Sequence, residues 1–457
     1  MAKSIPCNVP GLKDKAMAFL TAPFLATVAT ELGLRWRKTP LALPHLVAWF
    51  ARQILGGNLS MPELARRAGS IFTPEAYCIA RMKLPLKLLE ELLRRLCRLN
   101  GQPSSRWKGR HRLWHMDGTG ISMPDTRPLR KYFGQPSAQK RGCGFPVAHV
   151  LCLFDVASGL IENCIVGPLR THDLADAGKL HSHLQPGDVL IADRAFESFA
   201  HLAMLLSRGI HAILPMHQRR RIDFRVKRRR RSRGKRHRAQ AHRRQRRTPL
   251  LLDREVIGKW GSRDQITRWR KPTDKPRWMS RKEYGALPPT IDVRELRRSV
   301  VMPDGRNYQI TLITTLTDAR EYPAEDLLAV LKGRWTVEVN IRHLKTTMKM
   351  EILRSRTVAG IQRELWMFMI VYNAVRLVML EAAARQRVPA DRISFASALY
   401  WVRHGDLSGP MPWMEIVPYR PDRIEPRVNK RRNDRYKLMT KPRGQLRKSL
   451  AKRGVLC

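Results

Sequence analysis

Three acidic residues of this chain could together carry out chemistry on phosphodiester bonds. Asp117 and Asp193 each follow a run of residues typical of a β-strand, and Glu338 lies in a segment with helical periodicity. Three carboxylates that meet repel one another unless divalent cations lie between them. Two Mg²⁺ ions about 3.5–4 Å apart can activate an attacking oxygen and stabilise a leaving one, so no side-chain nucleophile is required.

Each acid also has a plainer explanation when it is considered alone. Asp117 could belong to an Asp-Gly turn, Asp193 could cap the following helix, and Glu338 could be a solvated surface residue. Asp188 is a rival to Asp193, but it begins the predicted strand rather than ending it. The chemical interpretation therefore depends on the elements that would bring the acids together.

The elements around Asp117 and Asp193 follow an order that would place these two acids close together. Periodicity predicts three strands, a helix, a strand, a helix and a strand, at residues 112–116, 148–156, 160–166, 173–184, 188–192, 198–207 and 211–216. This order is that of a ribonuclease-H-like sheet, in which the first and fourth strands are central neighbours. We therefore expect an α/β fold with a mixed sheet flanked by helices. Asp117 and Asp193 should end adjacent strands of that sheet.

Residues 331–345 predict a helix that presents Glu338 beside basic side chains. At about 100° per residue, one acid and three bases fall within an arc of about 80°: Arg334, Glu338, Arg342 and Lys345. An adjoining apolar stripe would let the same helix pack on a core. Taken alone, such a face is usually a solvated ion-pair surface, so its meaning depends on the other two acids.

The charge of the chain points to a polyanionic partner. Its 457 residues are 43% hydrophobic, which is enough to bury a core. Its 87 Lys and Arg residues against 38 Asp and Glu give a formal charge of +49, which does not fit an ordinary cytosolic enzyme. Contact with phosphate backbones is the natural use of such a field. A membrane surface would require a basic amphipathic helix, and the largest basic run lacks that pattern.

Cysteines and apolar segments exclude several other classes of protein. The seven cysteines are odd in number and dispersed, with no CxxC pair, which argues against a disulfide framework or a structural zinc site and favours reduced thiols. Residues 16–30 and 365–380 are apolar, but we expect both to be buried helices rather than a signal peptide or a membrane span. The sequence has no GxxxxGK[ST] loop of the kind found in ATPases.

Changes in composition divide the chain into five predicted domains. They are a helical domain at 1–105, the first part of the catalytic core at 106–218, a basic β-rich insertion at 219–322, the helical remainder of the core at 323–400, and a basic extension at 401–457. Within residues 219–247, 17 of 29 are Lys or Arg, which indicates a solvated, nucleic-acid-binding arm. Trp260, Trp269 and Trp278 lie between basic residues and could stack on bases, although packing is the more common role.

The N-terminal helices leave two interpretations open. A helix capped by Ser60, a turn at Gly69, and a second helix carrying Arg81 and Lys83 would suit a helix-turn-helix reader of DNA. That interpretation makes residues 1–105 a DNA-end-binding domain. A plain helical bundle has the same sequence pattern.

Three short motifs together resemble the bacterial DDE transposases of the group named for insertion sequence four. The motifs are Asp117-Gly118-Thr119, Asp193-Arg194-Ala195-Phe196 and Arg334-x3-Glu338-x6-Lys345. The last is most of the group's Tyr-x2-Arg-x3-Glu-x6-Lys signature, and the resemblance covers about residues 112–385 with the basic insertion expected of the group. The signature tyrosine falls at Leu331, which has no hydroxyl, so the contact of that tyrosine with the element end is absent or supplied elsewhere.

The resemblance implies a transposase that cuts its own insertion sequence out and pastes it into target DNA. Asp117, Asp193 and Glu338 would bind two Mg²⁺ ions, for which Mn²⁺ can substitute. Four basic residues would contact DNA: Arg334, Lys345, Arg342 and Arg194. Water would first attack at the element terminus, and the freed 3′-hydroxyl would then attack DNA, with a hairpin as an optional intermediate.

The resemblance also implies the partners and the location of the protein. The partners are double-stranded DNA, at the element ends and the target, and a second copy of the chain that brings the two ends together. The location is the bacterial cytoplasm, at the nucleoid. Two alternatives are a catalytically silent DNA-binding relative and a stand-alone metal-dependent nuclease. The presence of all three acids argues against the first, and the large insertion with the Arg-Glu-Lys segment argues against the second.

Overall fold

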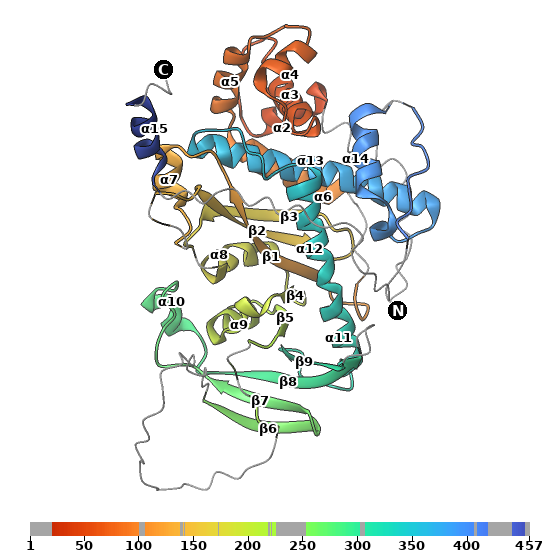
Figure 1. Ribbon diagram of the computed structural model, residues 1–457. Helices are drawn as coiled ribbons and strands as arrows, with labels where there is room; N and C mark the ends of the chain where they lie inside the picture. Colours follow the sequence, from red (N-terminus) through yellow and green to blue (C-terminus); the bar gives the residue numbers. More distant parts are fainter. Residues whose placement is uncertain are drawn as a thin grey trace. The chain divides into compact units, whose positions relative to one another are not determined.

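The computed structural model describes residues 21–99, 106–137, 140, 142–171, 173–217, 220, 222–224, 253–301, 307–405, 409–418 and 441–452. The chain divides into two compact units, one formed by Met1–His172 with Trp335–Cys457 and the other by Asp173–Arg334. Both units contain helices and β-strands (Figure 1). The expected α/β class is therefore confirmed. The five predicted domain boundaries remain predictions.

Within the described residues, the first unit begins with five helices. They are α2 (Ala22–Glu31), α3 (Leu43–Leu55), α4 (Met61–Arg67), α5 (Pro74–Lys83) and α6 (Leu86–Leu99). The Ser60 hydroxyl accepts a hydrogen bond from the backbone N–H of Glu63 at 3.3 Å, and this cap starts α4 as predicted. Gly69 then has a φ of +69°, a conformation that costs glycine little, and this turn separates α4 from α5.

The sheet of the first unit has three antiparallel strands in the order β3-β2-β1. They are β1 (Leu113–Ser122), β2 (Val147–Asp155) and β3 (Ile161–Pro168), with α7 (Arg127–Phe133) between β1 and β2. A short turn, at residues 156–160, joins β2 to β3. The Asp155 carboxylate accepts a hydrogen bond from the backbone N–H of Ser158 at 3.0 Å, and Gly159 has a φ of +68°.

One long helix, α13 (Val358–Gln386), forms the centre of the first unit. It is apolar nearly all round and packs against α3 and α6 (Figure 1). Among the described residues it alone is long and apolar enough to cross a membrane, but 89% of its most apolar window is buried inside the protein. The prediction of a buried core helix here is therefore confirmed. The unit also contains η4 (Ala390–Arg392), α14 (Phe395–His404) and α15 (Arg443–Ala451).

The expectation that residues 331–345 form one helix is wrong. Helix α11 (Ala324–Gly333) ends just before Arg334, and α12 (Trp335–Arg342) begins just after it. Gly333 favours this break because glycine is a poor helix former. A π turn, His343–Thr347, then follows α12, with the backbone N–H of Met348 donating to the His343 carbonyl at 2.9 Å. The residues of the predicted arc are therefore divided: Arg334 lies between the two helices, Glu338 and Arg342 lie in α12, and Lys345 lies in the π turn.

The second unit contains the two parallel strands of the predicted core. Strands β4 (Val189–Ala192) and β5 (His211–Pro215) are joined through η2 (Arg194–Phe196) and α9 (Phe199–Leu206). They follow α8 (Asp173–Leu180) and η1 (His181–His183). The chain order β1, β2, β3, α8, β4, α9, β5 is the order predicted for a ribonuclease-H-like core.

The β-rich insertion continues the sheet of the second unit. Strand β5 pairs antiparallel with β9 (Asn307–Thr314), and the sheet then runs through β8 (Thr290–Val301) and β7 (Asp264–Arg270) to β6 (Arg254–Gly261). A short helix, α10 (Arg281–Ala286), carries a capping box made by Ser280 and Glu283. Apart from residues 220 and 222–224, the basic arm predicted at 219–247 lies outside the described residues.

Candidate active site

Asp117 lies in the middle of β1 rather than at its end, which corrects the sequence prediction. The strand continues beyond it to Ser122, with Asp117 opposite Cys152 and Gly118 opposite Leu151. A Cβ atom at Gly118 would come within 2.7 Å of Nε2 of His149. Glycine therefore lets β1 continue where β2 comes close, and the Asp-Gly pair is not a turn.

The carboxylate of Asp117 is half-buried beside β2. Its Oδ1 accepts a hydrogen bond from the backbone N–H of Gly118 at 2.9 Å. Burial, together with the negative charge of Asp117, raises the pKa of the Cys152 thiol to about 12. Cys152 is therefore a protonated thiol at physiological pH.

Glu338 and Lys345 are supported on an element that packs against β1. Helix α12 carries the half-buried Glu338 and lies against β1 (Figure 1). The Lys345 ammonium, in the π turn after α12, donates to Oγ1 of Thr119 and to the carbonyl of Gly120, both at 3.3 Å. The structure of this unit therefore sets Asp117 and Glu338 on two packed elements. The Lys345 contact to β1 was not predicted, although Thr119 belongs to one of the recognised motifs.

Asp193 immediately follows β4, as the sequence predicts. Its Oδ1 accepts a hydrogen bond from the backbone N–H of Arg194 at 2.6 Å and lies 3.8 Å from Nε of Arg194. The Asp193 side chain is 42% exposed, so its carboxylate is accessible to solvent and ions. Asp188, the rival residue, is buried before β4 and accepts a hydrogen bond from the Gln185 N–H at 2.9 Å, which is a structural role.

A pair of buried histidines holds the segment immediately after Asp193. Nδ1 of His201 lies 2.8 Å from the carbonyl of Phe196, and Nε2 of His201 lies 3.0 Å from Nε2 of His181. These bonds require His201 to donate through Nδ1 and to accept from His181. Burial lowers the pKa of His181 to about 2 and that of His201 to about 4, so both rings are neutral at physiological pH.

A buried ion pair also holds the segment that follows Asp193. Glu197 pairs with Arg220 and accepts a hydrogen bond from the His217 N–H at 2.5 Å. The Arg220 guanidinium lies 4.5 Å from the ring centre of Trp269. Burial raises the pKa of Glu197 to about 7, against the opposing effect of Arg220. These supports were missed because Arg220 belongs to a run of basic residues that read only as a solvated arm.

The basic residues that were predicted to contact DNA have different surroundings. Arg342 is exposed at the end of α12, and Arg194 is 49% exposed beside Asp193. Arg334 is half-buried at the junction of α11 and α12, and Leu331, at the signature tyrosine position, is buried in α11. The exposed positions of Arg342 and Arg194 suit contact with phosphates.

Two further sequence candidates are structural residues. Trp269 is fully buried in β7, with its Nε1 donating to Oγ1 of Thr267 at 3.0 Å, so it cannot stack on a base. Trp260 is 42% exposed and Trp278 is half-buried, so both keep some accessible surface. Arg81, which was expected to suit a DNA-reading helix, is 5% exposed and donates to Oε1 of Gln53 at 2.7 Å. Arg81 is a core residue because its charge is paired inside the helical bundle.

The candidate ligands suit a divalent metal ion in their chemistry. The carboxylate oxygens of Asp117, Asp193 and Glu338 are the hard ligands that such ions prefer. Within the described ranges, no group of three or more His, Cys, Asp or Glu side chains forms a ready-made metal site. Asp117 and Glu338 belong to the first unit and Asp193 to the second, so the meeting of all three stays a prediction.

Comparison with known protein families identifies the class of this catalytic core. The transposase DDE domain family matches residues 108–374, which is more than half of the chain and contains all three acids. The chain belongs to this family. Members of the DDE transposase family generally use divalent metal ions.

Two curated proteins of Escherichia coli K12 resemble this DDE chain. The transposase InsG of insertion sequence element IS4 is 22% identical over 314 residues, covering 68% of this chain and 62% of InsG. InsZ, a protein provisionally named as a transposase, is 25% identical over 204 residues, covering 41% of this chain and 66% of InsZ. The chain thus spans just under two thirds of each relative. The predicted relationship to the insertion-sequence-four group is confirmed.

One solved structure shows a weak similarity to this chain. It is a cryo-EM structure of the piggyBac transposase synaptic complex with hairpin DNA, 9% identical to this DDE chain. The similarity covers 87% of this chain and 80% of that chain, with a TM-score of 0.40.

Proposed function

We propose that this protein is a DNA transposase of the cut-and-paste type. It would bind the ends of its insertion sequence, cleave them by metal-dependent hydrolysis, and join the freed 3′-hydroxyls to target DNA. The observation that carries this proposal is the family match across residues 108–374, a range that contains Asp117, Asp193 and Glu338. The placement of Asp117 and Glu338 on the packed elements β1 and α12 supports it.

Each of the three acids has a proposed role in holding metal. Asp117, Asp193 and Glu338 would together hold two Mg²⁺ ions. Mn²⁺ would be able to replace Mg²⁺. When bound, such ions lower the pKa of water and stabilise a departing oxygen. The half-burial of Asp117 and Glu338 limits the water around them and strengthens their attraction for a cation.

The basic residues around these acids would position the DNA strand. Lys345 is already fixed against β1 through Thr119 and Gly120, so its ammonium would meet a phosphate without further ordering. Arg334, Arg342 and Arg194 would neutralise neighbouring phosphates and release their counterions. Substituting Arg342 or Lys345 by Ala should weaken end complexes and reduce the salt dependence of binding, which a gel-shift titration at several NaCl concentrations would measure.

The proposed partners are double-stranded DNA and a second copy of the chain. Two element ends must be brought together before they are joined to a target, which a dimer can do. The chain carries +49 formal charges, and this field favours association with DNA at the bacterial nucleoid. Transposition would therefore take place in the bacterial cytoplasm.

A cleavage assay would test the proposal. Duplex DNA carrying the element's own ends is incubated with the full chain and Mg²⁺ or Mn²⁺, and the wild type is compared with Glu338→Gln. Metal-dependent cleavage and joining should be lost in Glu338→Gln while end binding is kept. Glu351→Gln is the matched control, since Glu351 is exposed beyond the π turn and should leave cleavage unchanged.

A catalytically silent relative is the alternative because Leu331 replaces the signature tyrosine. Leu331 is buried in α11 and has no hydroxyl, so it cannot make the contact expected of that tyrosine. Tight binding and synapsis without cleavage by the wild type would favour this alternative. Leu331→Tyr would then be the first substitution with which to seek cleavage.

A further inference from the structure

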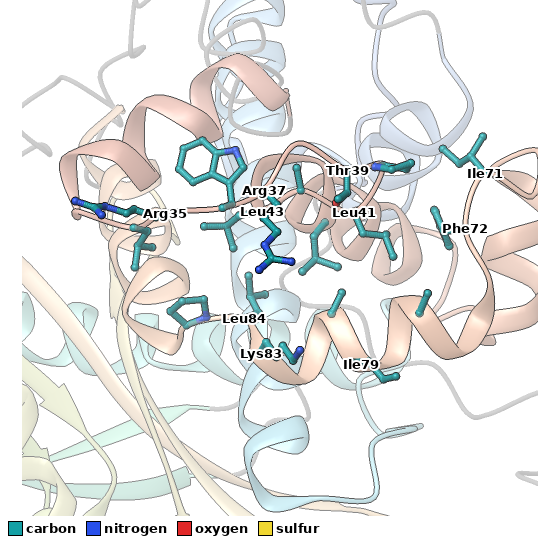
Figure 2. Close-up of a pocket in the computed structure, with 18 of the residues that line it drawn as sticks. Arg35, Arg37, Thr39, Leu41, Leu43, Ile71, Phe72, Ile79, Lys83 and Leu84 are labelled. Atoms are coloured by element: carbon teal, nitrogen blue, oxygen red, sulfur yellow. The ribbon is translucent and has the colours of Figure 1, made fainter.

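An apolar hollow opens on the surface of the N-terminal helices (Figure 2). It has a volume of about 780 Å³ and lies between the segment that precedes and begins α3 and one side of α5. Its walls are mainly aliphatic and aromatic, and include Leu34, Trp36, Leu41, Leu43, Phe72 and Ile79. A hollow of this size and composition can bury several apolar side chains of a partner.

Two residues that line the hollow, Ile71 and Ile79, are well exposed, and Met82 extends the apolar surface beyond it. Ile79 is 55% exposed, Met82 is 52% exposed, and Ile71 before the helix is 53% exposed. Arg81, the basic residue expected to read DNA, points inward to Gln53 instead. A helix that reads the major groove needs polar side chains on this face, so the exposed face of α5 suits a protein surface better than DNA.

Three cations stand around the hollow. Arg35, Arg37 and Lys83 line it and are exposed, and Figure 2 shows Arg37 and Lys83 reaching into the space between the two walls. Within the part of the chain that the structure describes, no acidic side chain pairs with any of the three. An occupant that buries apolar groups here would therefore gain by bringing its own carboxylates.

We propose that this face binds an acidic amphipathic helix of another protein. A second copy of this chain is a poor occupant because its own +49 charge would be repelled by the three cations. A small amphiphilic acid would fill the hollow but would leave the exposed Met82 beside it uncovered. A helix carrying apolar anchors at i, i+3 or i+4, and i+7, with Glu on its flanks, meets both the apolar and the charged requirement.

Fluorescent peptides would test this surface directly. The probe is a fluorescein-labelled synthetic helix with Leu anchors at those spacings and Glu elsewhere, titrated with the full-length protein in 150 mM NaCl. One control peptide replaces the Leu anchors by Ser and keeps every Glu. A second control replaces each Glu by Lys and keeps the anchors. Binding of the Leu/Glu peptide at least about tenfold tighter than both controls is expected. Equal binding of the Ser/Glu peptide would overturn the proposal, because it would show attraction by charge alone.

Surface substitutions would locate the binding site. Ile79→Asp should weaken binding of the Leu/Glu peptide about tenfold or more, whereas Ile352→Asp, at a site 52% exposed outside the hollow, should not. The double variant Arg37→Glu with Lys83→Glu should lose the Leu/Glu peptide and gain the Leu/Lys peptide. Its control, Arg127→Glu with Lys131→Glu, makes the same charge change on the exposed face of α7.

Two outcomes of these titrations would contradict the inference. One is unchanged peptide binding in both Ile79→Asp and the Arg37/Lys83 double variant. The other is a greater loss of binding to a 30-base-pair duplex than to the peptide in these variants, which would make this face a DNA surface. Circular dichroism of each variant confirms that it remains folded, which the exposure of all substituted side chains favours.

Discussion

The two units contain buried polar clusters of different chemistry. In the first unit, the fully buried carboxylate of Glu364 gathers donors from distant parts of the chain. It accepts hydrogen bonds from the Asn58 amide at 2.6 Å and from the backbone N–H groups of Arg354 and Ser355 at 2.8 and 2.9 Å. This carboxylate ties the N-terminal helices to the chain beyond the π turn.

The buried polar cluster of the second unit consists of histidines that must remain neutral. The His181–His201 pair fixes the carbonyl of Phe196, three residues after Asp193, and burial lowers the pKa of both rings. Protonating either ring would place a charge in the core, and a proton on Nε2 of His201 would also remove the acceptor for the His181 N–H. Acid therefore weakens the segment after Asp193 through protonation of a buried histidine.

The largest effect should come from removing either acid itself. Asp117→Asn in the first unit and Asp193→Asn in the second should each lower the rate of metal-dependent end cleavage by about 10³-fold or more, because each removes a ligand charge that acts in the transition state. Single-turnover cleavage of element ends would measure both rates. Asp292→Asn, at an exposed site in β8, is the control. Near-normal cleavage by either active-site variant would show that its acid is misassigned.

The next effect concerns the stability of the first unit. Glu364→Ala should lower the free energy of unfolding by about 3 kcal/mol or more, because it leaves buried donors and the Arg81 guanidinium, 3.7 Å away, without their acceptor. Urea denaturation followed by circular dichroism would measure it. Glu351→Ala, at an exposed position, should change little. A loss below about 1 kcal/mol for Glu364→Ala would contradict the proposed importance of this cluster.

A smaller effect should appear as pH dependence in the second unit. Folding lowers the pKa of each histidine below its usual value of about 6.5, so the unfolded chain binds more protons as the pH falls. The free energy that each neutral histidine contributes to folding is complete above about pH 6.5. It falls as the pH decreases toward the pKa of the folded state, which is about 4 for His201. Between pH 7 and pH 5 the loss should be about 2 kcal/mol for each histidine.

A double variant isolates the contribution of the histidine pair. His181→Leu with His201→Leu should flatten the dependence of unfolding free energy on pH relative to the wild type. Glu197 is present in both proteins, so its own titration cancels from the difference. Urea denaturation at pH 7, 6 and 5 provides the measurement. Identical slopes in the two proteins would show that the pair does not titrate on unfolding.

The smallest effect is expected at exposed ion pairs in both units. Arg268 and Asp292 pair at 2.8 Å on the second unit, and Arg67 and Glu63 pair at 2.7 Å on the first, all with largely or partly exposed side chains. Asp292→Ala and Arg67→Ala should shift the urea midpoint by no more than the scatter between repeats, since such pairs are screened by water and salt. A clear shift of the urea midpoint for only one of the two variants would contradict this expectation. It would show that the substituted residue belongs to a larger network of charges.

Local sequence signals predicted much of the fold. The caps and turns of the N-terminal helices depend on residues close in the chain, such as Ser60 and Gly69, and they were found where expected. The alternating pattern likewise gave the strand order up to β5. Strand β7 was missed because its residues mix charged and aromatic side chains, and its pairing with β6 and β8 defines it more than its composition does.

The candidate site was predicted less completely because distant contacts shape it. The three acids could be named from motifs, and Asp193 does follow β4. Asp117 was placed at the end of a strand because Asp-Gly resembles a turn, and only pairing with β2 carries β1 past it. Arg81 looked like a surface base, yet Gln53 and Ser355 pair with it inside the protein. No periodicity rule predicts such partners.

The π turn at His343–Thr347 also fixes how many residues this segment of the chain can contain. Deleting one residue there would restore ordinary helical geometry and rotate the downstream residues by about 100°. Lys345 would leave Thr119, and the buried Met348 would turn out of the core. Loops generally accept insertions and deletions at small cost. The stretch from Glu338 to Met348 should instead keep a constant number of residues in any working variant, whatever happens to the lengths on either side.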